Sequence, residues 1–228
     1  MAKPFSWSFS RLKNFETCAF RSLKCDLTKP ADGGYKESSE QLDWGNKVHA
    51  ALANSLVHGS SARLPPDMAV WGKWIAKLGA MPGELLVEKK YAFTRSFEPC
   101  EYFSPGVWCR VVVDILRLNG PVAFVGDWKT GRTNHNADQL TISAQAVFSH
   151  FPQVKKITSA FIWLQDGVPS KEVFTRNTVA NAWKNGLLQR VEAMEQAART
   201  NNYPKQPGGL CRKWCPVEIC EFHGVGSR

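Results

Sequence analysis

The sequence lacks several features that would place the protein in a well-marked class. No apolar run approaches the ~20 residues that a helix needs to cross a bilayer, and no apolar leader precedes Phe5, so we expect neither a membrane span nor a secretory signal. The phosphate-binding pattern GxxxxGK(S/T) is absent, which excludes a P-loop ATPase motor. There is no internal repeat and no low-complexity stretch, so a repeat array is also excluded.

Acidic residues are the scarcer charged class. The 228 residues contain 20 Asp and Glu against 29 Lys and Arg, which gives a formal net charge of +9 and a pI of about 9.3. This balance favours a polyanionic partner, with nucleic acid as the first candidate and a membrane surface as the second. A merely soluble basic protein is the alternative. The length and the 43% of hydrophobic residues allow one sizeable domain, alone or with an appended module.

Disulfides are not indicated, although the chain has seven cysteines. The number is odd and no secretory signal is present, so we expect a reducing, cytoplasmic compartment and metal ligation. Three cysteines lie in the irregular segment Gly208–Gly224: Cys211, Cys215 and Cys220. Thiols on backbone without regular structure predict a metal centre there, and a cysteine-rich loop without metal is the alternative.

The spacing in this tail leaves the kind of metal open. Zinc prefers paired C-x2-C knuckles, whereas the spacings here are C-x3-C and C-x4-C and no second knuckle follows. An iron–sulfur cluster needs four thiolates. Zinc could take His223 as its fourth ligand. The fourth thiolate of a cluster has four candidates: Cys18, Cys25, Cys100 and Cys109.

Hydrophobic periodicity predicts an α/β chain. We expect helices over residues 6–27, 40–57, 67–81, 136–151 and 178–200. We expect strands over 84–94, 156–165 and 171–176, and a β-hairpin over 107–132. The order of these elements predicts a layered α/β core with an N-terminal helical part.

The hairpin has a strong turn signal. Asn119 and Gly120 are typical of a two-residue loop, because both central positions must accept a positive φ. Leu118 would then pair with Pro121. A slip of one residue at the proline would turn one strand's side chains to the other face.

Two aspartates and a lysine occupy the apolar strands of this hairpin. In the expected register Asp114 lies opposite Val125, and side-chain alternation places Asp114, Asp127 and Lys129 on one face, with the aspartates as diagonal neighbours. Unpaired buried carboxylates are costly, so these groups are expected to bind a metal ion or another cation. A metal or acid–base site and a structural salt-bridge cluster both fit this pattern.

Five motifs in order carry a resemblance to a known family: GNKVH (45–49), VEKKY (87–91), VVVDIL (111–116), GDWKTG (126–131) and ADQLTISA (137–144). Together they resemble the RecB-like branch of the PD-(D/E)XK nuclease superfamily, which includes phage exonucleases and CRISPR-associated exonucleases. The opening SFSRLKNFETCAF (8–20) is similar to the N-terminal helix of that branch, where a cysteine often begins a four-cysteine iron–sulfur site.

The resemblance covers nearly the whole chain and implies a fold. That fold is a restriction-endonuclease-like α/β core, in which a mixed central sheet is flanked by helices. The chain would be a single nuclease domain, 1–228, with a helical part over 1–82 and the core over 83–200. A cysteine-rich, metal-binding tail over 201–228 would pack against the N-terminal helix.

The resemblance also implies roles for the motif residues. Three residues would hold Mg²⁺ or Mn²⁺: His49, Asp114 and Asp127. Glu88 would support the site, and Lys129 would position or activate the attacking water and offset charge at the phosphate. Gln139 matches the glutamine that orients the site and contacts DNA. The chain departs from the family at Ser143, which stands where a tyrosine is usual.

The cysteines acquire a role through the same resemblance. A [4Fe–4S] cluster would be held by Cys18, Cys211, Cys215 and Cys220, with Zn²⁺ at the tail as the alternative. Ala19 stands where a proline usually follows the first cysteine.

The implied function is a divalent-metal-dependent DNA exonuclease acting at single-stranded or frayed ends. A helicase or recombination partner in trans is possible within that branch, and no membrane is involved. Two other functions stay open. One is a structure-dependent endonuclease of the same superfamily, and the other is a non-catalytic DNA-binding or partner subunit on a nuclease fold.

Overall fold

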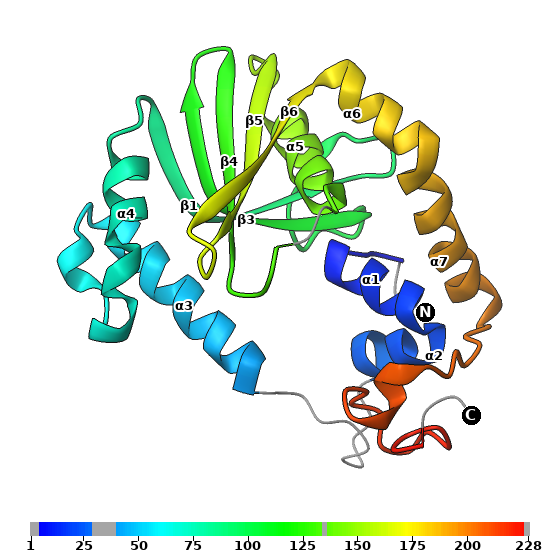
Figure 1. Cartoon of the computed structure of the whole chain (residues 1–228). Coiled ribbons are helices and arrows are strands. Elements are labelled where there is room, and N and C mark those ends of the chain that lie inside the picture. Colours follow the sequence, from blue (N-terminus) through cyan, green and yellow to red (C-terminus); the bar gives the residue numbers. More distant parts are fainter. Residues whose placement is uncertain (1–4, 29–39, 134–135, 226–228) are drawn as a thin grey trace. The chain divides into compact units, whose positions relative to one another are not determined.

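A computed structural model of the chain describes residues 5–28, 40–133 and 136–225 (Figure 1). The chain forms two compact units. The larger unit is Gln41–Trp183, and the smaller unit combines Met1–Glu40 with Lys184–Arg228. Among the described residues, no helix is long and apolar enough to cross a membrane.

The larger unit is built on a six-stranded mixed sheet in the order β2-β1-β3-β4-β5-β6. Its strands are β1 (Glu84–Phe93), β2 (Pro99–Cys100), β3 (Cys109–Asn119), β4 (Val122–Lys129), β5 (Lys156–Trp163) and β6 (Val168–Thr175). Only β4 and β5 pair in parallel, while every other neighbour is antiparallel. A parallel pair needs a crossover connection, and α5 (Asp138–His150) lies in that connection. The predicted mixed sheet flanked by helices is confirmed.

Helices lie against this sheet (Figure 1), and their apolar side chains pack into a core with those of the strands. α3 (Glu40–Val57) and α4 (Gly72–Gly79) contribute Val48, Leu52 and Ile75 to a core that includes strand residues such as Trp128 and Ile162. α5 contacts all six strands of the sheet. The strands at the centre of the unit are thereby fixed by helices that are distant in sequence.

The helix predicted over 67–81 forms only in part. Residues Pro66–Trp71 form a 3₁₀ turn, and α4 begins at Gly72. Pro66 stands at the start of this segment, where proline is favoured, but it provides no backbone N–H donor. The segment therefore begins as a short 3₁₀ turn. A second 3₁₀ turn, Ser61–Arg63, precedes it.

The β3–β4 hairpin has the expected strands, but the predicted loop is wrong by one residue. Asn119 pairs with Val122, so the turn consists of Gly120 and Pro121. Gly120 has φ +59, and proline fixes a negative φ at the next position. That combination fits a type II′ turn, whereas Asn119-Gly120 would form a type I′ turn. The predicted pairing of Leu118 with Pro121 is replaced by Leu118 with Ala123.

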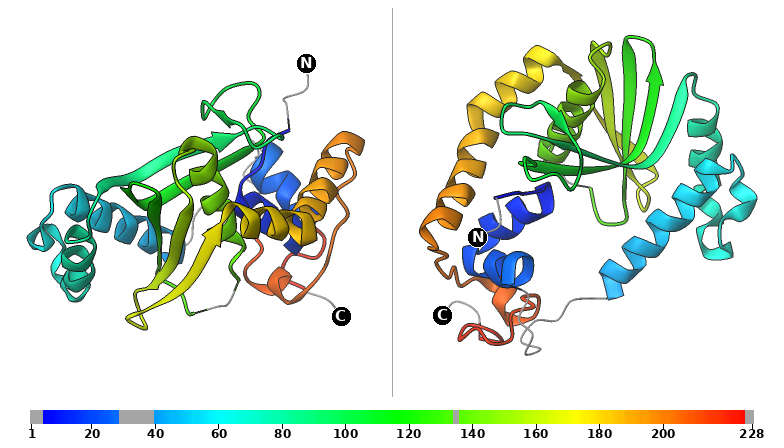
Figure 2. Two further views of the ribbon diagram at one scale, coloured as in Figure 1. Left: turned by 90° about the horizontal axis from the view of Figure 1, so that it is seen from above. Right: turned by 180° about the vertical axis from the view of Figure 1, so that it is seen from behind.

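The smaller unit brings the two ends of the chain together. It contains α1 (Phe9–Thr17), α2 (Ala19–Ser22), α7 (Leu188–Thr200), a π-helical turn at Leu23–Thr28 and a 3₁₀ turn at Gly209–Arg212. The π-helical turn Trp183–Leu187 begins at the last residue of the larger unit and leads into α7. Figure 2 shows α1 and α2 beside the C-terminal segment. The amide of Phe20 donates to the carbonyl of Pro204, and Glu16 on α1 is ion-paired with Arg190 on α7.

Two predicted helices are interrupted. The helix expected over 6–27 breaks at Cys18, whose backbone is extended (φ −167, ψ 116). The helix expected over 178–200 forms as α6 (Arg176–Ala182) and α7, joined by the π-helical turn at Trp183–Leu187. Apolar periodicity continues through both breaks, so the pattern did not reveal them.

Candidate functional site

Three donor groups from separate elements converge in the larger unit. His49 lies on α3, Glu88 on β1 and Asp114 on β3. Each offers one ligand atom, and these atoms lie within 4.8 Å of one another. The three residues line an open hollow of about 610 Å³, together with residues such as Val112 and Thr130. An imidazole and two carboxylates at this separation can surround one cation.

Asp114 is held by two contacts. Its Oδ2 lies 3.2 Å from Nδ1 of His49 and accepts a hydrogen bond of 2.9 Å from the backbone amide of Trp128. The β3–β4 ladder ends at the pair Ile115 and Gly126, so the Asp114 carboxylate satisfies an amide just beyond the last ladder pair. This bond fixes the carboxylate orientation before any ligand binds.

Glu88 has a left-handed backbone, with φ +50. The neighbouring pairs, Val87 with Ile115 and Lys89 with Val113, keep one register, so Glu88 stands opposite Asp114. A non-glycine residue in this conformation costs about 1–3 kcal/mol and persists only where its surroundings enforce it. The strain therefore falls on a residue of the candidate metal group.

The left-handed residue also changes which layer β1 packs against. Val87 packs against the apolar core that contains α3 and α4 residues. Tyr91 lies four residues further along, so in a regular strand its side chain would point the same way as that of Val87. Its ring instead contacts His150, the last residue of α5, and Phe151, which follows α5. Glu88 lies between Val87 and Tyr91, at the point where odd-numbered side chains change from one face of the sheet to the other. Sequence periodicity alone could not show this exchange.

Asp127, Lys129 and Gln139 form a second group. Lys129 Nζ lies 2.5 Å from Asp127 Oδ2 and donates to Gln139 Oε1 at 2.8 Å. Gln139 Nε2 donates to Asp127 Oδ1 at 2.6 Å. The three side chains close a ring of contacts between β4 and the first turn of α5. Lys129 is thus held in position, and an ammonium has three donors, so one can still reach a ligand.

The structure brings the two aspartates close but gives them different partners. Continuing the β3–β4 register by one position places Asp114 opposite Asp127, so they are in line and the predicted diagonal arrangement is wrong. Asp114 contacts His49 on α3, whereas Asp127 contacts Gln139 on α5. Glu88, which was predicted only to support the site, belongs to the metal group with His49 and Asp114. Asp127, which was predicted to be a metal ligand, instead contacts Lys129 and Gln139.

The electrostatics of the site indicate an excess of negative charge. Burial alone would lower the pKa of His49, but the contact with Asp114 and the charges of Asp127 and Glu88 raise it. Partial burial raises the pKa of Glu88, and the charge of Asp114 adds to this rise. Burial raises the pKa of Asp127 to about 6, against the opposing effect of the Lys129 ammonium.

The residues present fit a divalent cation. Two carboxylates and one imidazole provide mainly oxygen ligands, the set that suits Mg²⁺ or Mn²⁺. Partial burial is the main cause of the raised pKa of Glu88, and the charge of Asp114 adds a repulsion that a bound cation would relieve. The signals for Glu88 in the sequence were a lone acidic residue in an apolar strand and the VEKKY motif.

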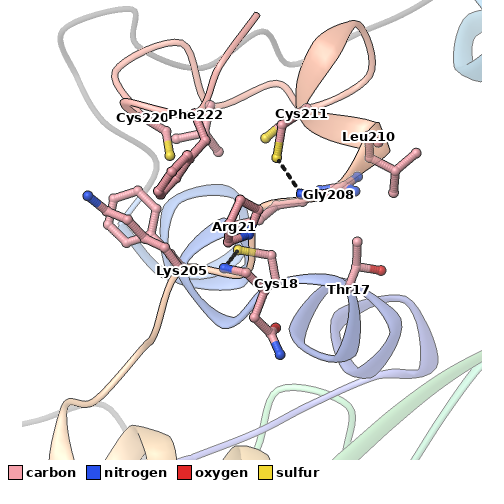
Figure 3. Close-up of a pocket in the computed structure, with 15 residues that line it drawn as sticks. Thr17, Cys18, Arg21, Lys205, Gly208, Leu210, Cys211, Cys220 and Phe222 are labelled. Carbon is pink, nitrogen blue, oxygen red and sulfur yellow. Dashed lines mark hydrogen bonds between the residues drawn. The ribbon is translucent and has the colours of Figure 1, made fainter. Parts of the chain in front are cut away.

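The predicted cysteine ligands meet in the smaller unit. Cys18, Cys211, Cys215 and Cys220 all line one pocket of about 220 Å³ (Figure 3). The other lining residues are mostly apolar or small, with Arg21 and Lys205 as the cations. Neither Cys25 nor His223 is among the described residues that line it. Cys100 and Cys109 lie on β2 and β3 in the larger unit.

Backbone amides already point at two of these thiols. The amide of Gln206 donates to Cys18 Sγ and the amide of Gly208 to Cys211 Sγ, both at 3.4 Å (Figure 3). Amide donors of this kind stabilise thiolate sulfur and tune the metal that it holds. The extended break at Cys18, which interrupts α1 and α2, places this thiol at the pocket.

Comparisons with known proteins find similarity to one sequence family and to solved structures. The sequence model described as the PD-(D/E)XK nuclease superfamily matches residues 6–221. No curated protein matches the chain. A solved structure described as the crystal structure of SSO0001 aligns over 98% of this chain and 89% of its own, with 12% identity and a TM-score of 0.39. The matched range includes both the residues of the candidate metal group and the four pocket cysteines.

Proposed function

The chain belongs to the PD-(D/E)XK nuclease superfamily, and from this premise we propose that it is a divalent-metal-dependent DNA exonuclease acting at single-stranded or frayed ends. The observation that carries the proposal is the convergence of His49, Glu88 and Asp114, whose ligand atoms lie within 4.8 Å of one another. The net charge of +9 supports a polyanionic substrate. The RecB-like motifs support the choice of exonuclease and a helicase or recombination partner in trans.

Mg²⁺ or Mn²⁺ is the proposed cofactor. His49, Asp114 and Glu88 would hold it, and Asp127 stays a predicted further ligand because its carboxylate lies next to this group in the register. Once bound, such an ion polarises a phosphoryl oxygen and lowers the pKa of a water molecule. The Trp128 amide keeps Asp114 oriented, so little reorganisation is needed when the ion binds.

Lys129 is the proposed catalytic residue for charge stabilisation. Its ammonium would donate to the phosphate oxygen on which negative charge develops, or to the attacking water. Gln139 and Asp127 are positioning residues for it, because each contacts Nζ directly. A preorganised cation at a partly buried site stabilises developing charge better than a mobile surface lysine would.

The cysteine pocket is proposed to hold a [4Fe–4S] cluster. Four thiols line one small pocket, and two of them already accept amide hydrogen bonds. Each thiolate of such a cluster binds a different iron, so the four sulfurs need not converge on a single point. Because Cys18 is separated from the other three by most of the chain, the cluster would link the two termini. A reducing compartment accords with this assignment.

The nuclease proposal is tested with labelled linear and closed circular single-stranded DNA in Mg²⁺ or Mn²⁺. Wild type should degrade the linear DNA, while Lys129→Ala and Asp114→Ala should lose most activity. Lys155→Ala, which changes an exposed lysine outside the candidate site, is the matched control. Equal activity in all variants would refute the site assignment. Cleavage of circles would identify an endonuclease, and inactivity of every protein would favour a non-catalytic subunit.

A further inference from the structure

The segment between β1 and β3 carries an aromatic pair at the surface. Phe103 is 80% exposed, the most exposed of the large hydrophobic side chains described. Its ring lies 5.0 Å from the ring of Tyr102 in an edge-on arrangement (82°). The Tyr102 ring supports the Phe103 ring from one side and leaves it open to solvent. An aromatic held this way offers a flat apolar face to a ligand.

Two cations flank the same pair. Lys90 Nζ and Arg110 Cζ lie 5.8 and 5.7 Å from the centre of the Tyr102 ring. Arg110 Nε also donates to the backbone carbonyl of Tyr102 at 2.8 Å, so the guanidinium and the loop hold each other in position. Stacked rings and fixed cations are the two components of a site for single-stranded nucleic acid.

This group continues the surface of the candidate metal site. Lys90 pairs directly with Val112, and Arg110 lies two residues from Val112 on the same strand, so all three share one face. Val112 itself lines the hollow that contains the metal-site donors. Arg110 precedes Asp114 by four residues, a strand length of roughly 13 Å. A flexible strand of DNA can span that distance with a few nucleotides.

We propose that Lys90, Tyr102, Phe103 and Arg110 form a platform that binds single-stranded DNA next to the metal site. This inference rests on the proposed nuclease function. A base would stack on the Phe103 ring, while the two cations would contact neighbouring phosphates. Stacking tolerates any base, since every base has a π-face. The platform would therefore hold a single strand without reading its sequence and direct its end toward His49, Glu88 and Asp114.

The charge around the platform supports a nucleic acid ligand. The acidic residues nearest in sequence are Glu88, Glu98 and Glu101. They are outnumbered by the cations of the same segment and the adjoining strand positions: Lys89, Lys90, Arg95 and Arg110. A docking site for another protein would need a wider apolar surface than one exposed ring. The platform thus fits a narrow polyanion with flat apolar groups.

The test measures binding separately from hydrolysis. Fluorescence anisotropy of labelled dT12 is recorded with no added divalent metal, where no turnover is expected. Phe103→Ala should weaken binding about 5- to 100-fold, as expected for loss of one stacked base. Phe103→Trp should retain it. Lys90→Ala should reduce the salt dependence of binding, with a slope smaller by about 0.7.

Two controls separate the platform from general effects. Val173→Ala removes an exposed apolar side chain on β6, and Lys155→Ala removes an exposed lysine outside the platform. Both should bind dT12 like wild type. Unchanged binding by Phe103→Ala, or an equal loss in the controls, would refute the platform whether or not the protein hydrolyses DNA. Conversely, platform-dependent binding without hydrolysis by wild type in Mg²⁺ or Mn²⁺ would refute the nuclease proposal and leave the platform standing.

Discussion

Glu88 stands opposite Asp114 in the β1–β3 register and is held there in a left-handed conformation. The conformation strains the backbone, and partial burial together with the facing charge of Asp114 raises the pKa of Glu88. Both effects oppose folding, and neither is needed to build the sheet, because the register is the same on either side of Glu88. Strain that is concentrated on a ligand group is typical of a functional site.

Glu88→Gly is therefore expected to stabilise the protein while abolishing metal-dependent hydrolysis. Glycine adopts a positive φ without steric cost, and the substitution also removes a carboxylate from the repelling pair. We expect a gain of about 1 kcal/mol, or roughly 2–4 °C in Tm for a chain of this size. Thermal unfolding and nuclease assays measure the two effects.

The adjacent Lys89→Gly variant provides the control for this prediction. Lys89 pairs regularly with Val113, so glycine there should cost about 0.5–1 kcal/mol in stability. If Glu88→Gly is destabilised as much as Lys89→Gly, the strain argument is wrong. If it is stabilised but keeps full activity, Glu88 does not serve the metal site.

Gln139 is expected to act through Lys129 rather than on the substrate. Gln139→Ala removes one of the contacts that hold the Lys129 ammonium, so hydrolysis should slow by roughly 10- to 100-fold. Lys129→Ala should slow it about 10²- to 10³-fold, as for loss of a transition-state donor.

A double variant distinguishes these roles. If Gln139 acts only by positioning Lys129, adding Gln139→Ala to Lys129→Ala should cause little further loss, because groups acting as a unit are not additive. Multiplicative losses would show that Gln139 has an independent function such as DNA contact. Gln145→Ala, elsewhere on α5, is the matched control and should remain near wild type.

The hairpin shows what periodicity can predict and what it cannot. The alternation of apolar residues predicted both strands, and their lone aspartates marked the site. The turn was misplaced by one residue because the Asn119-Gly120 signal ignores how Pro121 restricts the second turn position. The shift changed the partner of each residue, yet it kept Asp114 and Asp127 near each other because the register moved by two positions in total.

The convergence of the site depends on tertiary contacts that no local pattern contains. His49 reaches Asp114 because α3 packs against the sheet, and Gln139 reaches Asp127 because α5 covers β4. The family resemblance selected these residues from the sequence. It did not indicate the left-handed backbone of Glu88, since a positive φ at glutamate has no signature in composition or periodicity.

Glu16 should make the stability of the smaller unit depend on pH. Burial tends to raise the pKa of Glu16, but the hydrogen bonds and charges of Arg190 and Lys13 outweigh it and hold the pKa below its usual value of 4.5. The stabilisation is therefore complete above pH ~4.5 and is lost as the pH falls through the lower, folded pKa.

Glu16→Gln should accordingly unfold more easily than wild type at pH 7, and the difference should shrink below pH ~4.5. Urea unfolding at several pH values measures it. Glu218→Gln, an exposed position in the same unit, should show no such convergence. A stability difference between Glu16→Gln and wild type that is constant from pH 7 to pH 3 would contradict the linkage.

Loss of any one pocket thiol should release the cluster and destabilise the smaller unit. The unfolded chain has no preformed site, so the free energy of metal binding contributes to folding. Single Ser substitutions of Cys18, Cys211, Cys215 and Cys220, purified without oxygen, should lose the brown colour and most iron and sulfide. Cys25→Ala is the control, since Cys25 is buried outside the pocket lining, and it should keep both the colour and the iron and sulfide.

Zinc as the sole metal in wild type would replace the cluster with a zinc site. Absence of any metal from anaerobically purified wild type would leave the pocket as an apolar contact that links the termini without a cofactor.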